Sequence, residues 1–467
     1  MGERELLREL ARLVGTEHVL PAEPNSPYNQ DCSRRLELTG RADAVVLPGS
    51  GEQVAAVLGW CYAHDVPIVP RGGGTGLTGG AVPCAGGVVC SLERLRAVRE
   101  LSPELWRMEV QAGLTTATVK RLARENGLLF APDPGAAEQS QIGGNVATNA
   151  GGPHGLKYGV TGNWVMGLEA ALAPGELVRL GGWTPKDVAG YDLTSLLVGS
   201  EGTLGVITSV SLRLIPAPES AAALVAFLAS RAEGCDAMLA IRAAGIQPAA
   251  LEFLDGPTLA IVAAGYPGAI PRGASFALIV DVDGSREQVA AQASALREAL
   301  AAGAVSIEQP ADRSALWRWR DGFNGLVTGA RGAKVSEDVA FPVESLREGL
   351  ERFEAIAASR GLESCAWGHG GEGNVHATVL VDSAAPAQLQ AAREVEEELF
   401  AVVAALGGTI AAEHGVGALK SGRLAARWQE RAMELHESVK HAFDPRGLLN
   451  PGKKLARPPS AGRAGAG

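Results

Sequence analysis

The pattern of apolar and polar positions changes character near residue 219. Before it, short apolar runs alternate with stretches of helical period, which predicts strands at residues 45–48, 66–69, 88–92 and 107–110 and helices at 52–64 and 115–125. Thr115 or Thr116 stands where the N-terminal cap of the second helix is expected. The first part of the chain is therefore predicted to be a mixed α/β region.

After residue 219 the predicted elements follow a β-α-β, β-α-β order that resembles a ferredoxin-like sheet. The strands are expected at residues 224–228, 250–254, 276–282 and 305–308, and the helices at 236–244 and 285–302. Further helices are expected at residues 314–328, 343–360 and 386–406, and a strand-like run at 375–381. This order predicts a second, α+β domain.

Glycine is concentrated in the first part of the chain. Six of the ten residues from Arg71 to Gly80 are glycine, and they directly follow a predicted strand. Glycine lets bare backbone N–H groups approach an anion closely. The spacing is neither that of a P-loop nor that of a Rossmann fingerprint. It favours a diphosphate loop for another class of nucleotide cofactor, with a ligand-free surface loop as the alternative.

Two more glycine clusters lie at residues 132–152 and 190–208. Each alone could be a tight turn. Three such clusters in one half, rich in Asn, Thr and Ser, suit a long extended ligand that is held mainly by backbone.

Composition excludes several classes of protein. The net charge is −10, and no basic run is interleaved with aromatic residues, which argues against nucleic acid as a partner. The six cysteines form no C-x-x-C pair, so neither an iron–sulfur cluster nor a cysteine zinc site is expected. The charged N-terminus is not a signal peptide, and no apolar window of about 18 residues exists. We expect a cytoplasmic protein with reduced thiols.

Three histidines and a glutamate stand in two glycine-rich segments of the second half, at His369, His376, Glu413 and His414. Glycines between His369 and His376 permit a sharp turn that brings both imidazoles to one point. Two histidines and one glutamate suit a Zn²⁺-like ion with an open position, and His414 could then act as a base. The alternative is that these histidines make ordinary core hydrogen bonds.

These motifs together resemble the FAD-binding flavoproteins of the vanillyl-alcohol oxidase/p-cresol methylhydroxylase (PCMH) superfamily. The resemblance extends from about residue 20 to residue 455. It is strongest to the branch that comprises the GlcD-type flavoprotein of glycolate oxidase, D-lactate dehydrogenase and D-2-hydroxyglutarate dehydrogenase. It implies an α+β fold with a two-subdomain PCMH-type FAD-binding domain and a ferredoxin-like substrate (cap) domain with added helices.

The expected division of the chain follows from this resemblance. Residues 1–37 would be an N-terminal helical segment and 38–217 the FAD-binding domain. Residues 218–456 would be the substrate domain, its C-terminal segment returning to the flavin, and 457–467 a disordered tail.

The resemblance also implies which residues contact FAD. The diphosphate would be wrapped by Pro70, Arg71, Gly72, Gly73, Gly74, Thr75, Gly76, Leu77 and Thr78. The flavin and ribityl region would be lined by Pro132, Gly143, Gly144, Ala147, Asn149 and Gly152, the adenine side by Glu201, Gly202, Gly205 and Ile207, and the flavin ring by Asn450. Some relatives attach FAD covalently through a histidine of the first loop, which is absent here, so FAD is expected to be non-covalent.

Metal-dependent members of the branch carry the same His…His…Glu-His pattern. By resemblance His369, His376 and Glu413 become the ligands of a divalent metal, Zn or Mn, and His414 the general base. Arg320, in a W-x-x-R element, would bind the substrate carboxylate, because a guanidinium matches a carboxylate with two hydrogen bonds. Asn374 would bind the 2-hydroxyl or the carboxylate, and Lys334 is a further candidate for a second anionic group.

The implied activity is the oxidation of a D-2-hydroxy acid such as glycolate, D-lactate or D-2-hydroxyglutarate to the 2-keto acid, with hydride transfer to flavin N5. Electrons would leave to an electron-transfer flavoprotein, a quinone, a cytochrome or a partner subunit, with peripheral contact to the inner membrane allowed for. Three alternatives stay open: a transferase of the alkylglycerone-phosphate synthase type, a flavin-carrying accessory subunit of a glycolate oxidase complex, and an oxidase that reduces O₂ directly.

Overall fold

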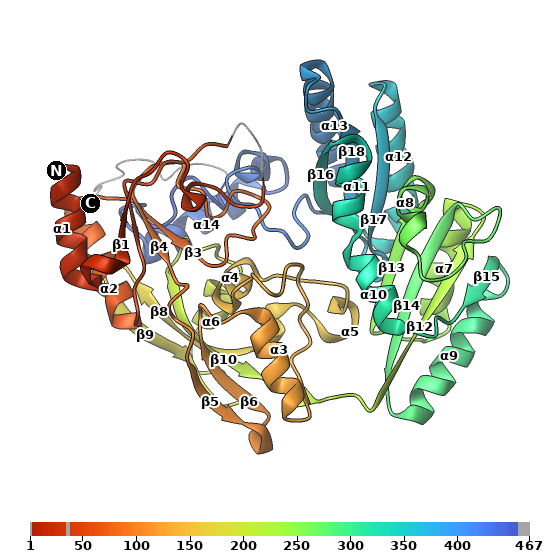
Figure 1. The fold of residues 1–467 in the computed structure, drawn as a ribbon, viewed down its shortest axis with the longest axis horizontal. Helices are drawn as coiled ribbons and strands as arrows, with labels where there is room; N and C mark the ends of the chain where they lie inside the picture. The colour runs from red at the N-terminus through yellow and green to blue at the C-terminus, as the bar shows by residue number, and fades with distance from the viewer. Residues whose placement is uncertain (1, 34–37, 456–467) are drawn as a thin grey trace. The chain divides into compact units, whose positions relative to one another are not determined.

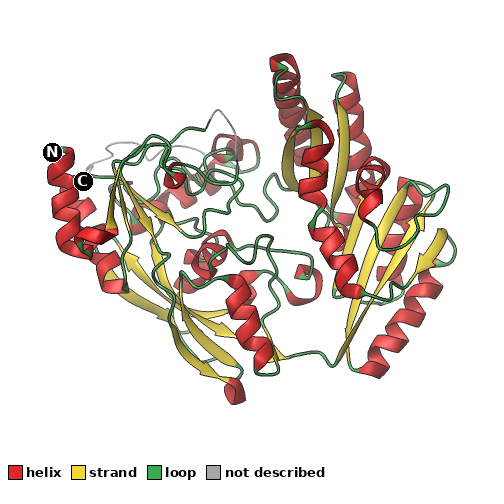
Figure 2. Ribbon diagram, viewed as in Figure 1, coloured by secondary structure: helices red, strands yellow, loops and turns green. Residues whose placement is uncertain are grey.

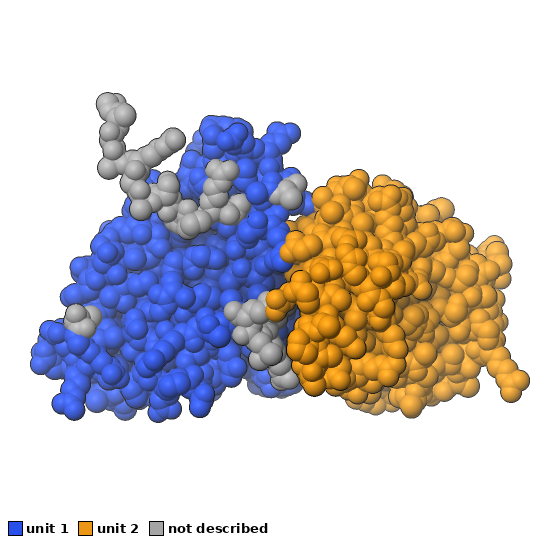
Figure 3. Space-filling model, turned by 90° about the horizontal axis from the view of Figure 1, so that it is seen from above, with its two compact units in different colours: residues 1–151, 160–217, 413–467 blue, residues 152–159, 218–412 orange. Residues whose placement is uncertain are grey.

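The computed structural model describes residues 2–33 and 38–455, so the expected tail at 457–467 lies outside the described residues. The chain forms two compact units (Figure 3). Unit 1 comprises residues 1–151, 160–217 and 413–467, and unit 2 comprises residues 152–159 and 218–412. The last segment of the chain therefore belongs to the unit that contains the three glycine clusters.

The first subdomain of unit 1 is built on a four-stranded sheet in the order β1-β2-β4-β3. The strands are β1 (Val19–Pro21), β2 (Ala44–Val46), β3 (Ile68–Arg71) and β4 (Val88–Ser91), with helices α1 (Glu3–Val14) and α2 (Gly51–His64) beside them. Strands β2, β4 and β3 run parallel, and every residue of β2 and β4 is buried. Burial on both faces explains why these strands read as unbroken apolar runs.

The second subdomain of unit 1 is a five-stranded antiparallel sheet in the order β5-β6-β10-β8-β9 (Figure 2). Its strands are β5 (Val98–Ser102), β6 (Arg107–Gln111), β8 (Val165–Leu172), β9 (Glu176–Gly181) and β10 (Val206–Arg213). Helix α3 (Thr116–Glu125) begins where expected, because the Thr115 side chain accepts a hydrogen bond from the N–H of Thr118. The shorter elements are β7 (Leu128–Leu129), α4 (Ile142–Thr148), α6 (Leu193–Leu197) and β11 (Ile215–Pro216).

The C-terminal segment of unit 1 consists of α14 (Glu430–Phe443) and the residues that follow it. The N–H of Ile68 donates to the carbonyl of Leu448, and the N–H of Asn450 donates to the carbonyl of Ile68. Buried Lys440 and Asp444 fix the turn between helix and strand-like segment, since Asp444 also accepts from the N–H groups of Leu448 and Leu449. The segment thus runs beside β3, the strand that leads into the first glycine cluster.

Unit 2 contains one seven-stranded sheet in the order β15-β12-β14-β13-β17-β18-β16, antiparallel throughout (Figure 1). Its first four strands are β12 (Ser220–Leu228), β13 (Ala250–Asp255), β14 (Phe276–Gly284) and β15 (Ala304–Glu308), and their order is that of a ferredoxin-like sheet. The sheet is extended by β16 (Ala333–Ala340), β17 (Glu363–His369) and β18 (Asn374–Val381). Of these three, the sequence predicts only β18.

Helices cover both faces of this sheet. One face packs against α7 (Arg231–Ala243), α9 (Arg286–Leu300), α12 (Leu346–Ser359) and α13 (Pro386–Ala405), and the other against α8 (Gly256–Val262), α10 (Arg313–Asp321) and α11 (Phe323–Arg331). The short helix α5 (Gly155–Tyr158) also belongs to this unit. No helix in the described part of the chain combines the length and the apolar character that a membrane crossing requires. The α+β fold expected from the sequence is confirmed.

The single helix predicted over residues 314–328 is wrong in one respect. The structure divides it at Gly322, whose N–H donates to the carbonyls of Arg318 and Trp319 and so tightens the end of α10. Glycine is a poor helix former, and its missing side chain leaves the backbone open to such a break. The break lies two residues after Arg320.

Asp255 caps α8 through the N–H of Thr258 and also accepts from the N–H of Ala366. Burial raises the pKa of its carboxyl to about 6, above the ordinary value of 3.8, although these N–H groups oppose the shift. The stability that this shift contributes is present below about pH 4 and is lost as the pH rises through about 6.

We therefore expect the difference in unfolding free energy between the wild type and Asp255→Asn to shrink as the pH rises from 4 to 7. Urea unfolding of both proteins across this range measures it. A difference that does not change with pH would contradict the assignment.

Candidate functional site

The first two glycine clusters of unit 1 pack directly against each other. A Cβ on Gly73 would lie 2.0 Å from the carbonyl oxygen of Gln139, and one on Gly72 would lie 3.4 Å from the Cα of Gly144. Gly143 is equally restricted, because its Cβ would meet the Cβ of Ala112 at 2.5 Å. Glycine is therefore required here by the close approach of two backbone segments.

Arg71 shapes the first loop from inside. Its guanidinium donates to the carbonyls of Gln30 and Pro27 and lies over the ring of Tyr28. Gly74, at φ +69°, leaves room for this side chain, since a Cβ there would overlap the guanidinium. A contact of Arg71 with a ligand would therefore involve its backbone.

The third cluster closes the group. The N–H of Glu201 donates to the carbonyl of Ala147 at 2.7 Å, and the N–H of Gly199 donates to the carbonyl of Val146 at 2.9 Å. A Cβ on Gly202 would lie 3.1 Å from the ring of Pro70. The three clusters thus meet within unit 1, as a backbone-lined ligand site requires.

Two buried side-chain atoms in this region have no hydrogen-bond partner among the described residues: Oε1 of Gln141 and Oγ of Ser200. Buried polar atoms are nearly always paired in folded proteins. Each of these atoms belongs to a glycine cluster, so both fit the role of contacts to a polar, extended ligand such as FAD. The sequence reasoning did not single out either residue.

Residues 413–417 are held by all three clusters. Thr78 donates its hydroxyl to the carbonyl of His414 at 3.3 Å, and the Glu201 carboxylate accepts from the N–H groups of Val416 at 2.9 Å and Gly417 at 2.7 Å. A Cβ on Gly151 would lie 2.7 Å from Oε2 of Glu413. The candidate base His414 is thereby fixed beside the candidate cofactor loops.

The side chains of Glu413 and His414 lie near each other, with Oε1 and Nε2 3.7 Å apart. The His414 side chain is 29% exposed. The segment is tightened by Gly417, at φ +53°, where a Cβ would meet the carbonyl of Thr78 at 2.1 Å.

The other predicted FAD contacts are placed as follows. Asn450 donates to the carbonyls of Gly80 and Glu201, which joins the first and third clusters. Asn149 accepts from the N–H of Gly162, Pro132 accepts from Lys120, Gly76 accepts from the N–H of Cys32, Thr75 and Leu77 stand in the first loop, Gly205 packs against Leu172, Ile207 is buried in β10, and Gly152 begins the short segment that belongs to unit 2. Their contacts to FAD stay predictions.

In unit 2 the two candidate histidines come together on a hairpin. His369 ends β17, a tight turn follows, and His376 lies in β18 opposite Trp367. Gly373, at φ +73°, allows the turn, because a Cβ there would meet the carbonyl of Phe341. The two imidazole rings are 5.5 Å apart and nearly perpendicular. Both side chains are at least 90% buried.

Asp338 of β16 lies directly opposite His376 in the sheet. Its carboxylate offers a ligand atom 3.9 Å from Nδ1 of His376, and it accepts from Nδ2 of Asn374 at 2.7 Å and from the N–H of Ala412 at 3.0 Å. Oδ1 of Asn374 is buried and has no partner among the described residues. That oxygen suits a hydroxyl or other donor of a ligand, as predicted for Asn374.

Arg320 of α10 and His369 share one carboxylate, that of Glu252 in β13. Nε of Arg320 lies 2.7 Å from Oε2, and Nδ1 of His369 lies 2.6 Å from Oε1. Burial alone would raise the pKa of Glu252, but the two cationic partners outweigh it and hold that pKa below its ordinary value. Glu252 is ionised and fully paired.

Lys334 lies on the same face of the sheet, with its ammonium 4.9 Å from the centre of the Trp367 ring and bonded to Oδ1 of Asn324. Burial lowers its pKa to about 8. Among the described residues no carboxylate forms an ion pair with it. This site therefore presents a cation without a matching acid.

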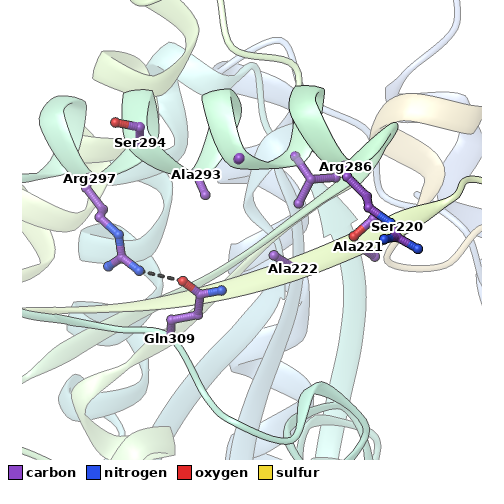
Figure 4. A pocket seen from close by; sticks show the side chains of 10 residues that line it. Ser220, Ala221, Ala222, Arg286, Ala293, Ser294, Arg297 and Gln309 are labelled. Atoms are coloured by element: carbon purple, nitrogen blue, oxygen red, sulfur yellow. Dashed lines mark hydrogen bonds between the residues drawn. The ribbon is translucent and has the colours of Figure 1, made fainter.

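A separate groove of about 470 Å³ lies between α9 and the edge strands β12 and β15 (Figure 4). It is lined by Arg286, Arg297, Gln309 and small residues, and Arg297 is bonded to Gln309 within it. It shares no lining residue with the histidine hairpin.

Sequence reasoning missed Glu252 and gave Asp338 no role. A signal for Glu252 was present: it is an acid inside the apolar run Ala-Leu-Glu-Phe-Leu, where a buried charge requires a partner. Nothing in the sequence identifies that partner.

The comparisons with known proteins decide the family. Residues 217–454 match the family of FAD linked oxidases, C-terminal domain, and residues 42–181 match the FAD binding domain. The chain belongs to the FAD-linked oxidases. It is accordingly a flavoprotein oxidoreductase, and the site on unit 1 lies in its FAD-binding domain.

Curated relatives cover nearly the whole FAD-linked oxidase. It is 37% identical over 434 residues to the glycolate oxidase subunit GlcD of Bacillus subtilis, with 92% of each chain covered. It is 34% identical to a D-lactate dehydrogenase of Archaeoglobus fulgidus, covering 96% of this chain and 99% of that one. It is 35% identical to a D-2-hydroxyglutarate dehydrogenase of Xanthomonas citri pv. viticola, covering 91% of each.

Solved structures share the fold at low identity. p-Cresol methylhydroxylase with substrate bound superposes with a TM-score of 0.79 at 18% identity, covering 97% of each chain. Alkyldihydroxyacetonephosphate synthase superposes with a TM-score of 0.75 at 17% identity, covering 96% of this chain and 86% of that one. These likenesses show the fold alone and confirm the PCMH-type architecture.

Proposed function

We propose that the protein oxidises a D-2-hydroxy acid to the 2-keto acid with FAD and a divalent metal ion. One observation carries the proposal: the loop of His414 is held by residues of all three glycine clusters, so a candidate base is built into the cofactor site. The names of the relatives support the substrate class.

FAD would be held by the backbone of the three clusters together with Gln141 and Ser200. When bound, FAD supplies the acceptor for the hydride that leaves C2 of the substrate. The first loop offers no histidine for covalent attachment, so we propose non-covalent binding.

His369, His376 and Glu413 would hold the metal, with Asp338 beside His376 as a further oxygen donor. Glu413 follows Ala412, whose N–H is bound by Asp338, and consecutive Cα atoms are about 3.8 Å apart, so chain connectivity keeps Glu413 close to this group. Imidazole and carboxylate donors with an open position suit Zn²⁺ or Mn²⁺. Such an ion supplies a charge that lowers the pKa of the substrate 2-hydroxyl.

The remaining work falls to three side chains. Arg320 binds the substrate carboxylate, since a guanidinium and a carboxylate match in charge and geometry. Asn374 accepts a hydrogen bond through its unpaired Oδ1 and orients the substrate. His414 removes the proton of the 2-hydroxyl as C2 gives up its hydride, and releases that proton after product leaves.

A transferase of the alkylglycerone-phosphate synthase type is the second candidate, because such a protein shares the fold. The higher identity to hydroxy-acid dehydrogenases favours oxidation. Electrons would pass from the flavin to a separate protein or quinone acceptor. Turnover of a panel of D- and L-2-hydroxy acids with an artificial electron acceptor tests the proposal: formation of a 2-keto acid from a D-acid supports it, and no product from any acid would refute it.

Lys334 suggests how the substrate side chain is read. A buried ammonium without a carboxylate partner is costly, and a second carboxylate of the substrate would offset that cost. We expect Lys334→Met to raise the KM for D-2-hydroxyglutarate by at least about tenfold, as for a lost charged hydrogen bond, and to leave that for D-lactate nearly unchanged.

In the wild type the preference for the dicarboxylate should also fade above about pH 8, where the ammonium loses its proton. Steady-state kinetics with both acids between about pH 6.5 and 9.5 measure both effects, a range that spans the ammonium's titration. Equal changes for the two acids would contradict a role for Lys334 in selectivity.

A further inference from the structure

Glu252 stands out in the core of unit 2 because it is a charged residue in an apolar strand. It is 1% exposed and lies between Leu251 and Phe253, both buried. An acid is almost never fully buried unless it is paired. Its position is set by the sheet, where Glu252 lies directly opposite His369.

The contact with His369 determines which ring nitrogen carries the proton. An ionised carboxylate can only accept hydrogen bonds, so the 2.6 Å contact between Oε1 and Nδ1 requires a proton on Nδ1. In the neutral ring Nε2 then carries the lone pair. Histidine ligands of metals are commonly fixed in this way by a carboxylate on the other nitrogen.

The contact with Arg320 involves the second oxygen of the same carboxylate. Oε2 accepts from Nε at 2.7 Å and also from Nη2. The guanidinium is largely buried, with 13% of its side chain exposed, so its orientation depends on this pairing. One carboxylate thus holds both a candidate metal ligand and the candidate binder of the substrate carboxylate.

We propose that Glu252 is the positioning residue of this site: it fixes His369 with the lone pair on Nε2 for a divalent ion, and it holds Arg320 in the orientation that meets the substrate. The inference rests on the proposed function. A neutral amide cannot replace it, because glutamine presents one acceptor oxygen and one donor NH₂ group, while His369 and Arg320 are both donors. In Glu252→Gln one of the two partners must lose its hydrogen bond.

The test measures metal binding without turnover. Chelator-stripped protein is titrated with Zn²⁺ against a fluorescent chelator of known affinity. We expect Glu252→Gln to bind Zn²⁺ on the order of 10–100-fold more weakly than the wild type. The KM for the hydroxy acid should rise in the same variant.

Two comparisons separate this role from a structural one. Asp255→Asn removes another fully buried acid of β13, three residues on, and should lower stability while leaving Zn²⁺ affinity unchanged. If Glu252→Gln fails to fold, Arg320→Gln and the double variant Glu252→Gln/Arg320→Gln replace it, because the double variant buries no unpaired charge. The double variant should bind Zn²⁺ more weakly than Arg320→Gln alone.

Equal Zn²⁺ affinity in Glu252→Gln and the wild type, or in Arg320→Gln and the double variant, would overturn the proposal. A wild type that binds no Zn²⁺ or Mn²⁺ at all would instead refute the metal site of the proposed function. The two failures are therefore distinguishable.

Discussion

Replacement of His414 by glutamine is expected to slow reduction of the bound flavin by substrate on the order of 10²–10⁴-fold, the contribution of a well-placed general base. The loop itself should keep its position, because Thr78 and Glu201 bind its backbone and not the imidazole. FAD content and Zn²⁺ binding should therefore stay close to wild type. Anaerobic stopped-flow absorbance at saturating hydroxy acid gives the rate.

His64→Gln is the matched control for this prediction. His64 is exposed at the end of α2, where its Nδ1 lies 2.8 Å from the carbonyl oxygen of Trp60. Its replacement should leave the rate unchanged. A His414 variant that reduces its flavin within a few-fold of the wild-type rate would remove His414 from the role of base.

Replacement of Arg320 by methionine should weaken both substrate binding and the fold. Loss of one partner of a buried, hydrogen-bonded charge pair costs on the order of 2–5 kcal/mol, so the Kd for the hydroxy acid should rise at least about 30-fold. Glu252 would also lose its main cationic partner, which lowers the free energy of unfolding. Flavin-absorbance titration with a 2-keto acid product and urea unfolding measure the two effects.

Arg318→Met tests whether these effects belong to the position or to the helix. Arg318 lies on the same helix but is 70% exposed and pairs only loosely with Asp312. An exposed pair of this kind contributes about 0–1 kcal/mol, so both measurements should stay near wild type. Equal ligand affinity in Arg320→Met and the wild type would contradict the assignment of Arg320.

Local signals in the sequence predicted much of the fold. Thr115 was identified as a helix cap because its hydroxyl acts within three residues, and β12 to β15 were recognised from apolar runs separated by helical stretches. The strands β16 and β17 were missed because they carry Lys334, Glu337, Asp338 and Gly368, which break the apolar pattern. Their polar residues are those that build the site.

The partners within the site could not be predicted, because they are distant in sequence. Glu252 meets Arg320 and His369 across 68 and 117 residues, and Thr78 meets His414 across 336. Glycine clusters and a histidine pattern reveal that a cofactor site exists. Only the pairing of strands β13 and β17 shows which acid orients the histidine.

The central claim is that a divalent ion and FAD act together on a D-2-hydroxy acid. The most direct test is anaerobic stopped-flow bleaching of the flavin by D- and L-2-hydroxy acids, before and after EDTA treatment. We predict rapid bleaching by a D-acid, loss of that bleaching with EDTA, and recovery on addition of Zn²⁺ or Mn²⁺. Bleaching that is unaffected by EDTA would contradict the metal's role, and no bleaching by any acid in metal-replete protein would contradict the proposed function itself.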